Sequence, residues 1–130
     1  MVREIVSRTG RTWIDEPRGI LRFQAAPGAD QGLADAKENI EAIVTLSEGE
    51  KKYPLLVDLT RCKALNQEAR AYYGRLEARS AYLALAILGR SPTSKMIGSF
   101  WFAMYGERDA PTRVFTLEAD AIAWLKGFAR

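Results

Sequence analysis

Two runs of alternating apolar and polar residues lie near the start of the chain, at 11–16 and 18–24. Alternation at every second position is typical of strands with one buried face. Because Pro17, Arg18 and Gly19 fall between the runs, the pattern predicts a β-hairpin. Residues 3–8 are a candidate for a further strand before it.

After these two runs, the spacing of apolar positions changes from every second residue to that of a helix. After the break at "AAPGADQG", apolar positions follow helical spacing from Asp30, and we expect this helix to end at Gly49. Its predicted inward positions are Leu33, Ala36, Ile40, Ile43, Val44 and Ser47. A second helix is predicted from about Asn66. Its inward stripe is Ala69, Tyr72, Tyr73 and Leu76.

Two apolar runs without a period, at 55–59 and 82–88, are typical of strands covered on both faces. A helix over 91–106 follows the second run, with Ser91 as its N-cap and Pro92 at its first position. A short strand at 112–116 and a helix at 117–128 end the chain. Thr116 is the predicted cap of that last helix, and its inward residues are Leu117, Ala121, Leu125 and Phe128.

The predicted order is β-β-α-β-α-β-α-β-α, in one domain spanning residues 1–130. Strands that alternate with helices indicate parallel strands joined by right-handed crossovers. We therefore expect an α/β fold with a mixed sheet of four to five strands, mostly parallel in sequential order, with an N-terminal hairpin. About four helices should lie largely on one face, which leaves the far face open to water or to a second subunit.

Composition and charge limit the classes of function that this protein can have. A net charge of +3, from basic residues scattered among acidic ones, does not indicate nucleic-acid binding. The single cysteine, Cys62, excludes an internal disulfide and fits a reducing compartment. No signal-peptide core and no window of 18 apolar residues occurs, so we expect a bacterial-type cytoplasmic protein without a membrane span.

The residue inventory argues against an enzyme. The chain has no histidine, which removes histidine-based triads and most zinc sites, and it has no glycine-rich phosphate loop. We therefore predict no catalytic residue, no cofactor and no metal. Cys62 has basic neighbours at Arg61 and Lys63 that could activate a thiol, but a small apolar filler is the alternative. Asp58 is expected to accept hydrogen bonds from the backbone of the turn that follows it.

The element order, with Asp58-Leu59-Thr60 ending a buried strand before a helix, resembles the STAS domain, the SpoIIAA-like fold of anti-sigma-factor antagonists. The ending "PTRVFTLEADAIAWL" is similar to that of bacterial STAS-like proteins. In the family's switch motif, a kinase phosphorylates a serine in Asp-Ser-Ser-Gly. Those four positions fall here on Asn66, Gln67, Glu68 and Ala69, so the resemblance implies a switch domain without its phosphorylatable hydroxyl. Glu68 either mimics a phosphorylated serine or suits the first turn of a helix.

Two surfaces are candidates for binding. Ligands of open parallel sheets bind at the carboxyl ends of the strands, where helix N-termini attract anions. The candidate anion edge comprises Thr60, Arg61, Lys63, Asn66, Arg90, Ser91 and Thr93. The alternative is that these residues cap helices and solvate the edge.

The second surface is the helix over 91–106, whose apolar positions cover more of its circumference than a surface helix requires. They indicate a protein interface or a pocket wall, and the alternative is a thick core. The candidate interface residues are Met96, Phe100, Trp101, Phe102 and Met104.

We therefore expect a non-catalytic regulatory or protein-interaction domain, with an unknown protein partner and a homo-oligomeric state. The alternative is a carrier or sensor of a small apolar or anionic ligand, held between the aromatic helix and the strand ends. A Cys62-dependent enzyme is the third hypothesis.

Overall fold

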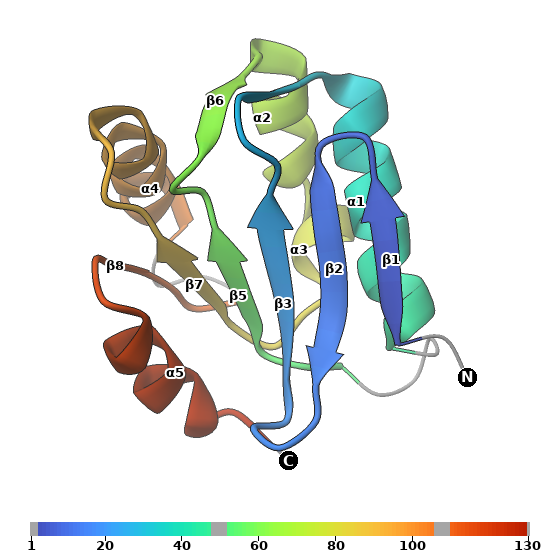
Figure 1. Cartoon of the computed structure of the whole chain (residues 1–130), viewed down its shortest axis with the longest axis vertical. Coiled ribbons are helices and arrows are strands. Elements are labelled where there is room, and N and C mark those ends of the chain that lie inside the picture. Colours follow the sequence, from blue (N-terminus) through green and yellow to red (C-terminus); the bar gives the residue numbers. More distant parts are fainter. Residues whose placement is uncertain (1–2, 48–51, 106–109, 130) are drawn as a thin grey trace.

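The computed structural model describes residues 3–47, 52–105 and 110–129, which form one sheet flanked by helices (Figure 1). The strands are β1 (Glu4–Ser7), β2 (Gly10–Asp15), β3 (Ile20–Ala25), β4 (Ala29–Gln31), β5 (Leu55–Asp58), β6 (Cys62–Leu65), β7 (Leu85–Leu88) and β8 (Thr112–Phe115). The helices are α1 (Leu33–Leu46), α2 (Gln67–Tyr73), α3 (Leu76–Arg79), α4 (Pro92–Tyr105) and α5 (Glu118–Lys126).

The main sheet has six strands in the order β1-β2-β3-β5-β7-β8. The first three strands are antiparallel, and β3, β5, β7 and β8 run parallel to one another. The predicted hairpin and the sequential order of the parallel strands are confirmed. The candidate segment at 3–8 contains β1, which adds one strand to the expected four to five.

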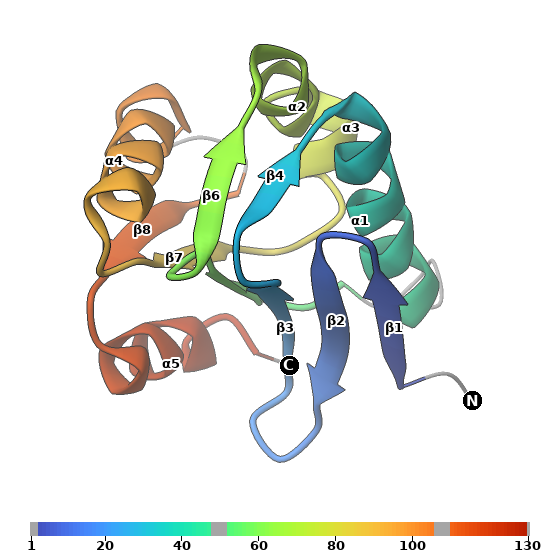
Figure 2. The same cartoon turned by 45° about the horizontal axis from the view of Figure 1, so that its top comes forward.

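A short second ladder extends the main sheet beyond the carboxyl ends of β3 and β5. It consists of β4 and β6, which pair in parallel and lead into α1 and α2 (Figure 2). The sequence analysis expected a break and a polar turn in these places, which is wrong. Strands of three and four residues are too short to show a period, so the pattern could not reveal them.

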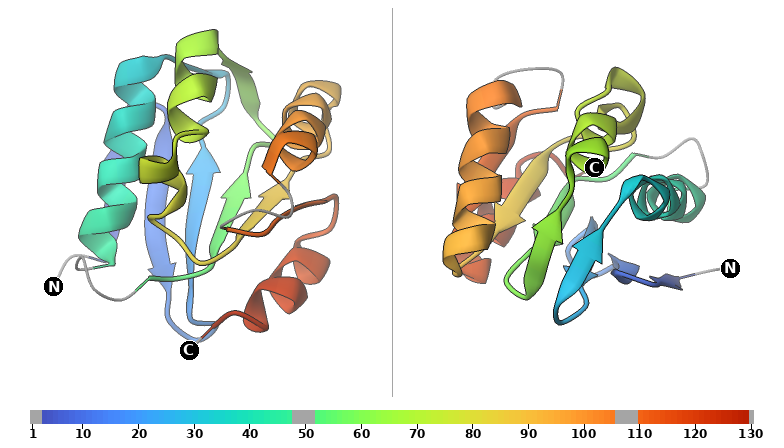
Figure 3. Two further views of the ribbon diagram at one scale, coloured as in Figure 1. Left: turned by 180° about the vertical axis from the view of Figure 1, so that it is seen from behind. Right: turned by 90° about the horizontal axis from the view of Figure 1, so that it is seen from above.

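One face of the sheet carries the larger core. Helices α1 and α2 lie over this face (Figure 3), and α3 and α4 contribute to the same cluster of buried side chains. Alternate strand residues point into it, among them Phe23, Leu55, Leu85 and Ile87, because side chains of a strand alternate between faces. The expectation that most helices share one face is confirmed.

The far face is not open across its whole width, and this corrects the expected architecture. Helix α5 packs there through Ala121, Ile122 and Leu125 against the other set of strand side chains, including Leu56 and Leu88. This helix follows the last strand of the sheet, so no later strand requires it to cross over on the first face. It instead covers the second apolar face of β5 and β7, which explains why β7 is apolar at every position and β5 is apolar up to Asp58.

The rest of the far face, over β2 and β3, is polar. The guanidinium of Arg11 lies 4.0 Å from the ring centroid of Trp13, and that of Arg22 lies 5.5 Å from it. Arg22 also pairs with Asp15 and Glu118. The uncovered part of the sheet is thus a surface of charged side chains around Trp13, unlike the apolar part under α5.

Several predicted boundaries and inward positions are wrong. Helix α1 begins at Leu33 instead of Asp30. Val44 is 45% exposed, because the buried stripe of α1 is narrower than expected. The predicted helix from Asn66 is divided after Tyr73 into α2 and α3. Leu76 therefore does not lie on the inward stripe of α2, and its side chain is 63% exposed.

At the chain's end, Leu117 rather than Thr116 is the N-cap of α5, and its side chain is 59% exposed. Ser91 and Pro92 begin α4 as predicted, and the Ser91 hydroxyl accepts a hydrogen bond from Ser94 N at 3.1 Å. The predicted helix end at Gly49 lies outside the described residues.

Candidate functional site

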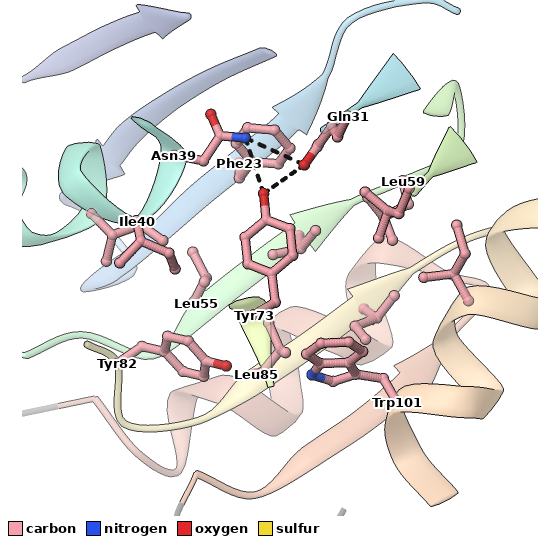
Figure 4. A pocket seen from close by; sticks show the side chains of 15 residues that line it. Phe23, Gln31, Asn39, Ile40, Leu55, Leu59, Tyr73, Tyr82, Leu85 and Trp101 are labelled. Carbon is pink, nitrogen blue, oxygen red and sulfur yellow. Dashed lines mark hydrogen bonds between the residues drawn. The ribbon is translucent and has the colours of Figure 1, made fainter. Parts of the chain in front are cut away.

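An interior cavity lies between the larger-core face of the sheet and helices α1, α2 and α4 (Figure 4). Its volume is about 80 Å³. Fifteen side chains line it: Phe23, Gln31, Asn39, Ile40, Ile43, Leu55, Val57, Leu59, Leu65, Tyr73, Tyr82, Leu85, Ile87, Ile97 and Trp101. Most are aliphatic or aromatic, so the space is suited to an apolar molecule.

The spacing of residues in each element explains why these side chains converge. Val57 of β5 and Ile87 of β7 are direct partners in the parallel ladder, so they sit side by side on the floor of the cavity. Ile97 and Trp101 are four residues apart on α4 and share its inner face. The ring of Trp101 meets that of Tyr73 edge-on, with centroids 6.3 Å apart, and joins α4 to α2 across the cavity.

One end of the cavity carries a polar cluster, which we define as Gln31, Asn39 and Tyr73. The Tyr73 hydroxyl donates to Gln31 Oε1 at 2.5 Å, and Asn39 Nδ2 donates to the Tyr73 oxygen at 3.1 Å (Figure 4). These residues come from β4, α2 and α1, so the cluster depends on the short ladder that leads into both helices. Burial raises the pKa of Tyr73 far above its usual range, outweighing the opposing effect of the Asn39 hydrogen bond.

Asn39 is held in place from the hairpin side. Ser7 Oγ donates to Asn39 Oδ1 at 2.9 Å, and Asn39 Nδ2 also approaches Thr9 Oγ1 at 3.3 Å. Asn39 and Thr9 are 3% and 1% exposed, so these contacts satisfy polar groups that water does not reach. The polar end of the cavity is therefore a fixed set of hydrogen-bonding groups.

The cavity is electrically neutral. Among the residues that the structure describes, none that lines the cavity is acidic or basic. Burial also raises the pKa of Tyr82 far above its usual range, so both cavity tyrosines stay protonated at neutral pH. Such a site can bind and orient a molecule, but it lacks a group that could exchange a proton near neutral pH.

The candidate anion edge is only partly assembled. Leu59 N donates to Leu88 O, so the loops containing Thr60 and Arg90 are neighbours at the carboxyl end of β5 and β7. Lys63 and Asn66 lie farther along the chain, on β6 and at its end. None of the seven candidate residues lines the interior cavity.

Within this edge, two residues act as helix caps. Asn66 Oδ1 accepts from Ala69 N at 2.8 Å, and the Ser91 hydroxyl caps α4. Arg61, Lys63 and Arg90 are exposed, and Thr93 is half-buried in the first turn of α4. The Thr60 hydroxyl is buried and has no hydrogen-bond partner among the described residues. An anion site here stays a prediction.

The residues that match the family's switch positions begin α2. Asn66 is the N-cap, and Gln67 and Glu68 are the exposed residues of the first turn. A carboxylate in this place complements the positive end of the helix. The arrangement accounts for Glu68 without a phosphoserine role.

The predicted interface on α4 divides into two sides. Met96, Phe100, Phe102 and Met104 are 68%, 45%, 45% and 50% exposed. Trp101 is 4% exposed and lines the cavity, so its assignment to the interface is wrong. With α4 packed on the sheet, its large side chains serve both a pocket wall and an outer surface.

The turn after β5 is structural. Asp58 Oδ1 accepts from Thr60 N at 2.9 Å, as predicted. Cys62 is buried, and its Sγ lies 3.7 Å from the carbonyl oxygens of Ala29 and Ala64. Burial raises the pKa of this thiol, which favours the filler interpretation over a reactive nucleophile.

The polar cluster of Gln31, Asn39 and Tyr73 was not predicted from the sequence. Gln31 was assigned to a break and Tyr73 to the core, but Asn39 carried a signal. It lies beside Ile40 and Ile43 on the buried side of α1, where an amide requires hydrogen-bond partners. A polar residue inside a predicted apolar stripe could therefore have indicated a buried polar site.

Membrane-spanning helices and metal-binding groups are both absent from residues 3–47, 52–105 and 110–129. No helix there is long and apolar enough to cross a membrane. In the same ranges, no group of three or more histidine, cysteine, aspartate or glutamate side chains is arranged to hold a metal ion.

Comparisons with known proteins agree with this architecture. The chain is similar to an uncharacterized protein of the DUF3478 family with a SpoIIAA-like fold from Shewanella loihica PV-4. The TM-score is 0.63 at 15% sequence identity, over 96% of this chain and 95% of the other. No curated protein matches the sequence. The fold is thus SpoIIAA-like, and a family model described as "Domain of unknown function (DUF7793)" matches residues 12–129, so the chain belongs to that family.

Proposed function

We propose that this chain is a non-catalytic binding domain that holds one small, mainly apolar ligand in its interior cavity. The observation that carries the proposal is an apolar cavity of about 80 Å³ with a hydrogen-bonding cluster fixed at one end. Apolar walls with a few placed polar groups are the usual features of small-molecule sites.

The energetics of packing support a ligand here. At about 24 cal/mol per Å³, an unfilled space of about 80 Å³ destabilises a fold by roughly 2 kcal/mol. A molecule that fills it restores lost contacts and stabilises the folded state. The neutral lining favours binding without chemistry, and the buried, unpaired Cys62 fits the reducing cytoplasm, where we place this function.

A cavity-filling variant tests the proposal. We expect Leu85→Phe, which adds volume at the cavity wall, to abolish retention of a small molecule seen by native mass spectrometry of the wild-type protein. The matched control is Leu76→Phe, the same change at an exposed position. Failure of wild-type protein purified from its native host to retain any small molecule would contradict the proposal, as would equal retention in Leu85→Phe.

A second candidate function rests on the outer side of α4. Met96, Phe100 and Met104 follow one another at four-residue spacing and form an exposed apolar stripe. Such a stripe is self-complementary when two copies of a helix pack against each other, and methionine adapts well to such contacts. We propose that the partner is a second copy of this chain, in a regulatory interaction domain.

Light scattering coupled to size-exclusion chromatography tests this candidate. We expect a dimer for the wild-type protein and a monomer for Phe100→Ser. The control is Leu76→Ser, which removes an equally exposed apolar side chain on α3 and should leave the dimer intact. A monomeric wild-type protein at all concentrations would exclude this interface.

A further inference from the structure

The cavity's shape and polarity specify its ligand more closely, and this step rests on the proposed function. We propose that the ligand is a small neutral alcohol whose hydroxyl binds the cluster of Gln31, Asn39 and Tyr73. Its hydrocarbon part lies among the aliphatic and aromatic side chains farther inside. Three properties of the site lead to this assignment: its volume, its lack of charge and the hydrogen-bonding capacity left in the cluster.

The volume limits the number of carbon atoms. An apolar cavity of about 150 Å³ accommodates the six carbons of benzene, so the space of about 80 Å³ here suits roughly three or four non-hydrogen atoms. Long acyl chains and fused rings are too large unless the helices move apart.

The lack of charge excludes anions and cations. No arginine or lysine is among the described residues that line the cavity, so a carboxylate would lose its hydration without gaining a partner from them. An ammonium group would be equally unpaired, since the described part of the lining contains no aspartate or glutamate. The ligand of this site is therefore neutral, which separates it from the anionic ligands considered for the strand ends.

The cluster then selects a group that donates a hydrogen bond. The one proton of the Tyr73 hydroxyl is directed to Gln31 Oε1, and the Asn39 amide donates to Tyr73 while lying close to Thr9 and Gln31. Gln31 Oε1 already accepts from Tyr73 and from Asn39 Nδ2, whereas the Tyr73 oxygen accepts from Asn39 alone and keeps a lone pair for another hydrogen bond. A ligand hydroxyl supplies this donor, whereas an ether oxygen of the same size cannot.

Three probes of nearly equal size separate these properties. They are propan-2-ol, its isomer ethyl methyl ether, and propanoate. In NMR titrations of the full chain, we expect the significant chemical-shift changes to occur at cavity residues. The affinity for the alcohol should be about five-fold higher than that for the ether, because the alcohol gains one net hydrogen bond. We expect no binding of the carboxylate at the cavity.

Two substitutions test whether the preference for the alcohol arises at the polar cluster. Tyr73→Phe removes one acceptor of the cluster, so we expect the affinity for the alcohol to fall to that for the ether, while the affinity for the ether stays within two-fold. The control is Tyr82→Phe, which removes the hydroxyl of the other cavity tyrosine outside the cluster and should preserve the preference for the alcohol. The wild-type comparison of alcohol and ether tests the assignment even if Tyr73→Phe does not fold.

The outcomes distinguish the two proposals. Binding of alcohol and ether with equal affinity would overturn the assignment of a hydroxyl while leaving a ligand cavity in place. Binding of propanoate as tight as that of the alcohol would overturn the neutral class. Absence of cavity shifts with both the alcohol and the ether would contradict the proposed function itself.

Discussion

At the scale of single residues, Asp35 connects the hairpin to the helix that carries the polar cluster. Its Oδ2 accepts from Gly32 N at 2.9 Å at the start of α1, and Arg8 Nε donates to its Oδ1 at 3.0 Å. The hydrogen bond from Arg8, assisted by that from Gly32, holds the pKa of Asp35 below its usual range despite partial burial. Asp35 thus fixes the start of α1 and, through it, the position of Asn39.

The lowered pKa of Asp35 leads to a prediction about pH. A carboxyl group whose folded-state pKa lies below its unfolded value stabilises the protein above the unfolded pKa and loses this effect as pH falls through the folded pKa. We therefore expect Asp35→Asn to lower the free energy of unfolding at pH 7 by about 1 kcal/mol, as for lost helix caps. The difference from wild type should shrink as the pH falls from about 5 to 3.

Urea unfolding of both proteins across this pH range measures the effect. Glu41→Asn is the matched control, because Glu41 is exposed on the same helix and lies six residues beyond Asp35, outside the first turn. A difference between wild type and Asp35→Asn that stays constant from pH 7 to pH 3 would contradict the role of the ionised carboxylate.

At the scale of elements, the long periodic segments were predictable and the short irregular ones were not. The hairpin, β5, β7 and α4 each have a clear alternation, apolar run or capping signal over four or more residues. The ladder of β4 and β6 has none, because its pairing partners are distant in sequence and its strands are too short. The polar end of the cavity was not predicted for the same reason, since Gln31 reaches its partners only through that ladder.

The break between α2 and α3 shows a second limit of sequence patterns. Tyr73 and Leu76 fit one stripe, but Gly74 ends α2, and Arg75 takes an extended conformation as the N-cap of α3. Glycine lowers helix propensity, so the chain turns there and Leu76 reaches the surface. Tyr73 remains as the last residue of α2, where its hydroxyl can meet Gln31 and Asn39.

The start of α2 provides the prediction at this scale. We expect Asn66→Ala to destabilise the protein by about 1 kcal/mol, because Asn66 Oδ1 caps the helix by accepting from Ala69 N. Glu68→Ala should change the free energy of unfolding by less than about 0.5 kcal/mol, since its side chain is exposed. Chemical denaturation measures both values. A larger loss for Glu68→Ala than for Asn66→Ala would show that the carboxylate, rather than the cap, organises this turn.

At the scale of the whole molecule, one sheet separates two cores with different roles. The larger core, under α1 to α4, contains the cavity, and the smaller one packs α5 against the other face. Leu55 and Leu56 are adjacent in sequence yet belong to different cores. The sheet therefore lets the chain keep a well-packed face for stability while the opposite face tolerates an unfilled space.

This separation predicts that stability and ligand binding respond to different substitutions. Leu125 of α5 is fully buried in the smaller core, so Leu125→Ala should lower the free energy of unfolding by about 2–5 kcal/mol. Because the sheet lies between this residue and the cavity, the affinity for propan-2-ol should stay within two-fold of wild type under conditions where the variant is folded. Ile43→Ala, a similar truncation in the cavity wall, should change both quantities. Calorimetric or chemical unfolding combined with NMR titration measures them together. A large loss of affinity in folded Leu125→Ala would mean that the two faces of the sheet are coupled and that α5 belongs to the binding site.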